Sequence, residues 1–184
     1  ERDQDRKKEH YEKALVQFRS VEHYAYIART LFLIAFEIPE QDETAWQRRI
    51  MLLNESLSNA EKIGSVSQID MCITHLALWL TVTGDYENGE RMSRRSLTAA
   101  IRTGRGTAYV AWIALTMARI SLELGHLDRA ITLLGWTMRH VPDTPDLIGG
   151  AWAEEEREFV RQIELRGRAV KSDEEFQAIF NGGA

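Results

Sequence analysis

The chain is poor in three things: its 184 residues include one cysteine, Cys72, only three prolines and no long apolar run. A single cysteine excludes an internal disulfide, and the scarcity of proline permits long helices, because proline removes a helical hydrogen bond. The longest apolar stretches are about half the length that a membrane span requires. Residues 1–8 form a charge run that lacks the apolar segment of a signal peptide. We therefore expect a protein of the reducing cytoplasm with no membrane contact.

The chain does contain enough apolar residues, 44%, to bury a core and enough charged residues, 28%, to stay in solution. Its net charge of −5 argues against a general nucleic-acid surface, which normally carries a basic stripe. We expect no direct nucleic-acid binding by this chain. One local basic patch is present, and we interpret it as a solvated helix face: Arg91, Arg94, Arg95, Arg102 and Arg105.

A sequence pattern returns every 40 to 42 residues. The triplet at 84–86 is matched 41 positions later by the triplet at 125–127. Repeats of this length are typical of stacked helical hairpins, which bind other molecules, so the repeat predicts a class of fold without naming a ligand. Four further residues return 40 positions later: Ser56, Leu57, Ala60 and Gly64 recur as Ser96, Leu97, Ala100 and Gly104.

Apolar residues recur within each repeat at i, i+3, i+4 and i+7, the spacing of a helix face. Each unit consists of helix A, a tight turn and helix B, and the A helices align on Ala35, Ala77 and Ala118. A small residue at this site lets neighbouring helices approach to about 8–10 Å. The pattern predicts helices at about 6–21, 24–38, 45–63, 66–83, 86–103, 107–124, 127–140, 147–167 and 172–181.

Glycine and proline mark the ends of these helices. Gly84 and Gly125 stand where a helix is expected to end in a left-handed residue, a conformation that glycine adopts readily. In the first unit Pro39 is expected to stop helix A, because proline cannot continue it. The turn that follows is longer, and Asp42 or Thr44 is expected to cap the next helix.

These signals predict an all-α fold: a right-handed α-α superhelix of about three and a half hairpins, followed by C-terminal capping helices. Residues 1–21 read as the second helix of a hairpin whose first helix is missing, so we expect a fragment of a longer protein. A proline-containing break at 142–145 ends the array. The expected organisation is a half-repeat at 1–21, capping helices at 143–184, and three hairpins between them at 22–64, 65–104 and 105–142.

The turns and small residues resemble those of tetratricopeptide repeats. Gly84-Asp85-Tyr86 with Gly89, and the segment 125–130, are similar to that repeat's turn and its small position in helix B. The aligned alanines match its small position in helix A, and Pro142 matches its terminal proline. The chain departs from the family in its longer period, since that repeat has about 34 residues, and in lacking a large aromatic residue early in helix A.

A narrower resemblance covers most of the chain. Residues 11–31, 129–135, 155–158 and 173–178 resemble the repeats and terminal helices of large bacterial signal-transduction ATPases of the STAND type. That family includes LuxR-type and maltose-regulator-like transcription activators, in which such repeats follow a nucleotide-binding module. The resemblance implies the sensor or scaffold part of a bacterial signalling or transcription regulator.

In tetratricopeptide arrays the A helices line a concave surface, and the resemblance places nine side chains of this chain there. Arg29 and Arg119 offer planar guanidinium groups suited to a carboxylate or phosphate. Phe32, Phe36 and Trp112 offer large apolar anchors. In the alternative interpretation, the aromatic side chains pack between helices and the arginines are solvated. The full set is Arg29, Phe32, Phe36, Met71, Thr74, Leu78, Trp112, Leu115 and Arg119.

No catalytic or metal-binding pattern stands out. Cys72 and His75 lie one helical turn apart, but two ligands do not make a zinc site, so we interpret them as a core cysteine beside an ordinary histidine. We expect no metal, no cofactor and no enzyme activity, and an all-helical enzyme is the least favoured interpretation. The leading hypothesis is a non-enzymatic module that binds a protein, a peptide or a small-molecule inducer. The alternative is a homo-oligomerisation scaffold such as a homodimer.

Overall fold

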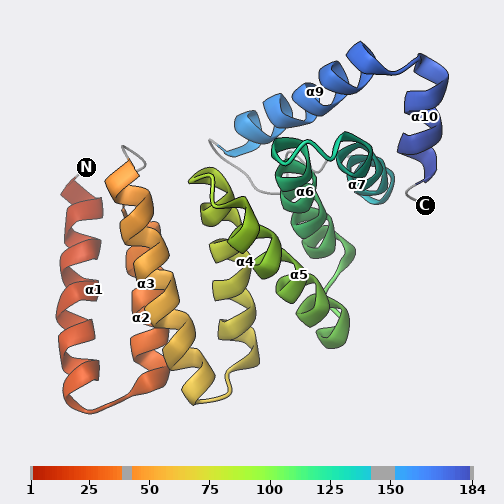
Figure 1. The fold of residues 1–184 in the computed structure, drawn as a ribbon. Coiled ribbons are helices and arrows are strands. Elements are labelled where there is room, and N and C mark those ends of the chain that lie inside the picture. The colour runs from red at the N-terminus through yellow and green to blue at the C-terminus, as the bar shows by residue number, and fades with distance from the viewer. Residues whose placement is uncertain (1, 39–42, 142–151, 183–184) are drawn as a thin grey trace. The chain divides into compact units, whose positions relative to one another are not determined.

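The computed structural model describes residues 2–38, 43–141 and 152–182. Within these ranges the chain forms nine α-helices and no strand, so the predicted all-α class is confirmed (Figure 1). None of the described helices is both long and apolar enough to cross a membrane. The helices are α1 (Arg2–Ser20), α2 (Tyr24–Phe36), α3 (Glu43–Lys62), α4 (Val66–Val82), α5 (Tyr86–Thr103), α6 (Thr107–Glu123), α7 (Leu127–His140), α9 (Trp152–Val170) and α10 (Asp173–Gly182).

Most helix boundaries fall within two residues of those predicted from the sequence. The largest differences are at α1, which begins at Arg2, and at α9, which ends at Val170 rather than 167. The predicted start of α9 at 147 and the break at 142–145 lie outside the described residues. Pro39 and Asp42 lie outside them too. Thr44 is inside α3, which begins at Glu43, so the prediction that Thr44 caps this helix is wrong.

The chain divides into two compact units, residues 1–85 and residues 86–184. In unit 1, α1 to α4 pack in sequence, and α2 contacts α4 as well as α3 (Figure 1). In unit 2, α6 packs against α5 and α7, and α7 also contacts α9 and α10. The predicted hairpins at 22–64 and 105–142 each lie inside one unit. The hairpin at 65–104 is divided between the units and stays a prediction.

The turns have the conformation that the glycines predict. Gly84 and Gly125 have φ angles of 79° and 78°, in the left-handed region that a side chain disfavours. The amide after each glycine donates to a carbonyl five residues back: Asp85 to Leu80 at 2.9 Å and His126 to Ser121 at 2.7 Å. These bonds satisfy carbonyls at the helix C-terminus, as in a Schellman motif.

The α1–α2 turn uses the same hydrogen bond without glycine. His23 N donates to Phe18 O at 3.0 Å, and the left-handed residue is Glu22, with a φ angle of 51°. No glycine marks this turn in the sequence, although the helices on either side were predicted. Beyond the turn, α1 packs on α2 through a cluster of apolar side chains, with Leu52 of α3 at its edge. The buried members are Leu15, Ile27, Leu31 and Ile34, and Tyr11, Phe18 and Tyr24 pack against them.

Two tryptophans and an arginine join α3 to α4. The rings of Trp46 and Trp79 lie 4.8 Å apart between centroids. The guanidinium carbon of the buried Arg49 is 4.9 Å from the first ring centroid and 4.5 Å from the second. Arg49 also donates a hydrogen bond to the carbonyl of Ile38. A desolvated cation in contact with an indole ring is held by about 2 kcal/mol or more.

Unit 2 is closed by its two last helices. Phe159 and Ile163 of α9 and Phe176 of α10 enter the same buried cluster as Leu115 of α6 and Leu134 of α7. The backbone of α10 approaches α7 closely at Gly135, where a Cβ atom would lie 1.9 Å from the carbonyl oxygen of Phe180. The aligned alanines of both units, Ala35, Ala77 and Ala118, are all buried, as their packing role predicts.

Candidate functional site

Side chains suited to recognition in unit 1 lie on adjacent sides of α2 and α4; most are exposed, and two of them, Gln68 and His75, are half-buried. We call this surface the α2–α4 face; it consists of Tyr26, Arg29 and Phe36 from α2 with Gln68, Met71 and His75 from α4. In each helix the three positions fall within about 60–80° of arc at 100° per residue. Because two reversals of direction separate α2 from α4, the two rows run in the same direction (Figure 1).

An aromatic cluster occupies one end of the face. The Phe32 and Phe36 rings are 4.8 Å apart, and the His75 ring lies 5.3 Å from Phe32 and 4.7 Å from Phe36. Phe32 is 7% exposed and Phe36 is 44% exposed. Of the two predicted phenylalanine anchors, Phe32 therefore packs inside and supports Phe36, which presents its ring to solvent.

His75 belongs to this cluster although the sequence interpretation treated it as an ordinary histidine. Burial lowers the pKa of His75 to about 4, so the ring is neutral at pH 7 and serves as an apolar edge for the two phenylalanines. The signal that could have found it is spacing. His75 lies four residues after Met71 and seven after Gln68, on the same side of α4.

A cavity of about 360 Å³ occupies the other end of the face. Arg29 lies in its wall and makes no hydrogen bond or ion pair with any described residue. Tyr26 is fixed beside it, because its ring stacks on Phe18 with centroids 4.8 Å apart and planes 20° apart. The cavity thus offers an available guanidinium next to an ordered phenol ring. Its lining residues are His23, Ala25, Tyr26, Arg29, Ile63, Ser65 and Gln68.

The three predicted positions in α4 differ in what they offer. Met71 is 36% exposed and lies between the cavity and the aromatic cluster. Thr74 and Leu78 are buried, and the Thr74 hydroxyl donates to the carbonyl of Asp70 at 2.8 Å. Only Met71 therefore contributes appreciable side-chain surface.

The three predicted positions in α6 belong to unit 2 and lie in a different environment. Leu115 is 1% exposed and packs in the core with Phe159. The guanidinium carbon of Arg119 is 5.9 Å from the Phe159 ring centroid, and Trp112 makes an edge contact with Tyr109. Six of the nine predicted residues lie in unit 1 and three in unit 2. That all nine line one groove stays a prediction.

A second cavity, of about 630 Å³, is lined in unit 2 by residues 125–129 and Lys171. Its charged side chains have partners: Lys171 Nζ lies 2.7 Å from an oxygen of Asp128, and Arg129 Nη1 lies 2.7 Å from Glu90 Oε1. Because breaking these pairs opposes binding of a new anion, this cavity suits a charged ligand less well than the cavity at Arg29.

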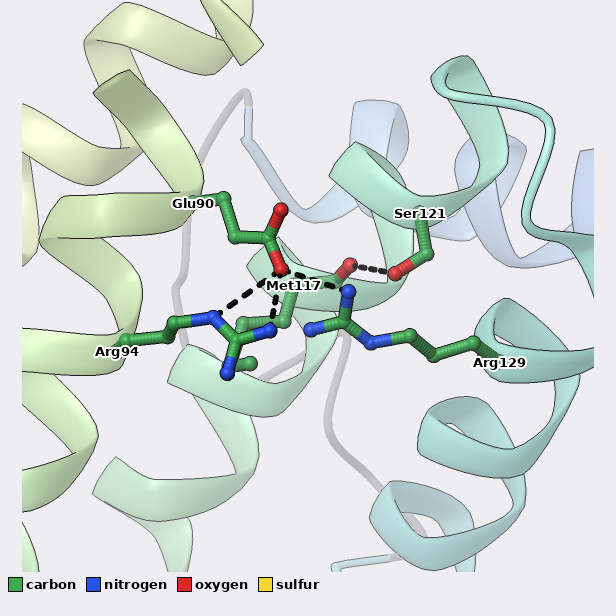
Figure 2. A network of polar contacts seen from close by, with 5 residues as sticks. All are labelled: Glu90, Arg94, Met117, Ser121 and Arg129. Atoms are coloured by element: carbon green, nitrogen blue, oxygen red, sulfur yellow. Dashed lines mark hydrogen bonds and ion pairs between the residues drawn. The ribbon is translucent and has the colours of Figure 1, made fainter. Parts of the chain in front are cut away.

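Figure 2 shows the polar network around Glu90, which ties α5 to α7. Glu90 Oε1 accepts hydrogen bonds from Arg129 Nη1 at 2.7 Å and from Arg94 Nη2 and Nε at 2.8 and 3.2 Å. These bonds to the arginines hold the pKa of Glu90 below its ordinary value. The adjacent Ser121 hydroxyl donates to Met117 O at 2.8 Å. The network connects helices of unit 2.

The described residues include no group of three or more His, Cys, Asp or Glu side chains placed to hold a metal ion. Cys72 is buried, its sulfur lies 3.1 Å from the Ser56 hydroxyl, and burial raises the pKa of its thiol. A buried neutral thiol is a poor nucleophile, because the thiolate is the reactive form.

Comparison with protein-family models gives no match, and comparison with curated proteins gives none either.

Proposed function

We propose that this chain is a non-enzymatic binding module of stacked helical hairpins that recognises its ligand at the α2–α4 face. The observation that carries the proposal is the pairing of two features on this face. An exposed phenylalanine, Phe36, rests on a rigid aromatic cluster, and Arg29, without a partner among the described residues, borders a cavity of about 360 Å³. An anchored aromatic ring and an available guanidinium are the two side-chain types that dominate binding energy at interfaces.

The spacing of these groups defines the ligand. Seven residues separate Arg29 from Phe36 along α2, which corresponds to about 10 Å at 1.5 Å per residue. An extended peptide spans that distance in about three residues. The ligand we propose therefore carries a carboxylate or phosphate for Arg29 and an apolar group for Phe36 and Met71. A peptide segment of a partner protein meets this description, and so does a small anionic inducer with an apolar end.

The wider proposal is that the two units form part of a right-handed helical-repeat array in a larger bacterial regulator. The 40-residue repeat and the resemblance to the repeats of signal-transduction ATPases support it. In such a protein the ligand shifts the array between two arrangements and a neighbouring module responds, which requires different affinities for the two arrangements. Small-angle X-ray scattering tests the array: a profile that fits one curved superhelix supports it, and a profile of two freely moving units contradicts it.

A thermal-shift screen of the 184-residue chain against short acidic peptides and anionic metabolites tests the binding function. A ligand present at one hundred times its dissociation constant stabilises the folded state by about 2.7 kcal/mol. For a chain of this size that corresponds to a rise of about 5–10 °C in Tm.

Variants then locate the site. Arg29→Ala and Phe36→Ala are each expected to reduce the shift of any hit to about a third or less, because loss of an anchor costs about 2 kcal/mol or more of binding free energy. The matched controls are Arg6→Ala and Val16→Ala, which remove an exposed arginine and an exposed apolar residue from α1. A hit whose shift survives both face variants would show that the ligand binds elsewhere and would end the proposal for this face.

A homo-oligomerisation scaffold is the second candidate, and the surface of α1 favours it. Val16 and, in the following turn, Val21 are each 68% exposed. Light scattering over a hundredfold range of protein concentration separates the two candidates. A mass that doubles with concentration in the wild type but not in Val16→Asp supports pairing through α1, and a constant monomer mass rejects it.

A further inference from the structure

Helix α5 carries arginines along one side and small residues along the other. We call the exposed side the arginine face; it consists of Arg91, Arg94, Arg95 and Arg102. At 100° per residue these four positions fall within an arc of about 100°, and from Arg91 to Arg102 they extend over about 16 Å. All four are exposed. Arg105, also exposed, continues the row just beyond the helix.

The opposite side of α5 is held in the core of unit 2. Its small residues, Gly89, Ser93, Ser96 and Ala100, are buried. The hydrogen bond from Arg129 of α7 to Glu90 holds the first turns of α5 in place. From there α5 is helical throughout, from Tyr86 to Thr103. The arginine face is therefore displayed in a fixed orientation from a rigid element, which lowers the entropic cost of docking a partner.

The segment that carries the face supplies no acidic side chain of its own. Residues 91–106 contain five arginines and no aspartate or glutamate, in a chain whose net charge is −5. Glu90 meets Arg94 at the N-terminal end. Arg91 and Arg102 make no hydrogen bond or ion pair with any described residue. A surface of one sign in a protein of the other sign attracts and orients a partner of opposite charge.

An apolar side chain interrupts this charge. Ile101 lies beside the arginines and is 70% exposed. Polyphosphate backbones make no use of such a residue, and the segment 91–106 contains no aromatic side chain on which a base could stack. An acidic protein helix with a narrow apolar stripe uses both, since carboxylates eleven positions apart match Arg91 and Arg102 and its apolar stripe covers Ile101.

We propose that the arginine face of α5 is a docking surface for an acidic amphipathic helix of a partner protein. It is a second surface, separate in sequence and composition from the α2–α4 face, and it does not depend on the function proposed there. The arginines bind carboxylates through paired N–H donors, and Ile101 sets the register of the partner helix through apolar contact.

The test uses the 184-residue chain and a fluorescein-labelled 18-residue helical peptide with glutamates on one side and a leucine stripe beside them. Binding is measured by fluorescence anisotropy at low and physiological salt. A peptide of the same composition in scrambled order, a 20-base-pair DNA duplex and vesicles containing phosphatidylserine are the comparison probes. We expect the amphipathic peptide to bind most tightly, and we expect salt to weaken it because the contacts are charged and exposed.

Two variants and one matched control identify the surface. The double variant Arg91→Glu/Arg102→Glu is expected to weaken peptide binding by about tenfold or more, since two attractive pairs become repulsive. The variant Ile101→Ser is expected to weaken the amphipathic peptide by about threefold to tenfold through loss of apolar contact, without changing any binding of DNA. The control Arg6→Glu/Arg166→Glu makes the same change of net charge at exposed arginines outside α5.

Three results would overturn the proposal. Equal loss of binding in Arg91→Glu/Arg102→Glu and in the control Arg6→Glu/Arg166→Glu would show attraction by net charge alone. If DNA or vesicles bind more tightly than the peptide, and if Ile101→Ser does not change their affinity, the surface would be assigned to nucleic acid or to an anionic membrane. Absence of binding by the amphipathic peptide at low salt would leave the arginines as a solvated face, provided that circular dichroism shows the wild type to be folded.

Discussion

Equivalent positions of helix A have different fates in the two units. Aligned on Ala35 and Ala118, Phe32 corresponds to Leu115 and Phe36 to Arg119. In unit 1 Phe36 is open to solvent, whereas in unit 2 Arg119 lies over the ring of Phe159 and Leu115 joins the core below it. The difference is made by α9, whose Phe159 and Ile163 cover α6. The same repeat position is therefore open to solvent only where no later helix packs over it.

Loss of the Phe159 ring of α9 should have the largest effect on stability. Phe159→Ala is expected to destabilise unit 2 by about 3–5 kcal/mol, because a buried aromatic ring is lost and a cavity remains. Hydrogen exchange monitored by mass spectrometry should show α6 and α7 losing protection while α2 and α4 keep theirs. The matched control is Leu165→Ala, at a 57% exposed position of the same helix. Equal loss of protection in unit 1 would contradict the view that α9 stabilises its own unit.

The second-largest effect should be the destabilisation of unit 1 by acid. The pKa of His75, about 4, lies below the ordinary value of 6.5, so the unfolded chain binds the proton more readily. Stability is therefore full above pH 6.5 and falls as the pH drops from 6.5 to 4, by up to about 3 kcal/mol. His75→Phe should remove this loss, as measured by urea unfolding of unit 1 across that range. A slope that persists in the variant would assign the acid sensitivity to another group.

The close approach of α10 to α7 gives a smaller effect, confined to unit 2. Gly135→Ala is expected to destabilise this unit by about 1–3 kcal/mol, because the new Cβ atom meets backbone at Phe180 and α10 must shift. Gly106→Ala is the control, since a Cβ atom there meets nothing within 4 Å. Urea unfolding followed by hydrogen exchange in α10 measures both. Unchanged protection of α10 in Gly135→Ala would show that α10 accommodates the new Cβ atom without loss of stability.

The Glu90 network should give the smallest effect. The arginine partners hold the pKa of Glu90 below its ordinary value of 4.5, so its contribution is present above that value and is lost as the pH falls below it. Glu90→Gln should destabilise unit 2 by about 1 kcal/mol at pH 7 and flatten the decline below pH 4.5. Glu123→Gln removes an exposed carboxylate of α6 as the control. A Glu90→Gln profile parallel to the wild type would show that these bonds add no net stability.

The helices could be predicted from the sequence because their signals are local. The spacing of apolar residues and the left-handed turns at Gly84 and Gly125 depend on neighbours a few residues away. The α1–α2 turn makes the same hydrogen bond with Glu22 as its left-handed residue, so no glycine in the sequence marks it.

The candidate site could be predicted only in part. The resemblance to tetratricopeptide repeats implies a surface position for Arg29, Phe36 and Met71, and all three are exposed. It cannot tell that Phe32 turns inward against His75, or that Phe159, 44 residues beyond Leu115, covers α6. Those outcomes depend on packing between segments far apart in the chain.

The close, tilted indoles of Trp46 and Trp79 also give unit 1 an optical signal of its own. Two such chromophores at 4.8 Å couple their electronic transitions and produce a paired positive and negative band in circular dichroism. The guanidinium of Arg49, 4.9 and 4.5 Å from the two ring centroids, is expected to shift their emission through its electric field. Because α3 supplies one ring and α4 the other, this signal reports whether the helices remain packed. The opening of unit 1 can therefore be followed in the native chain without an added label.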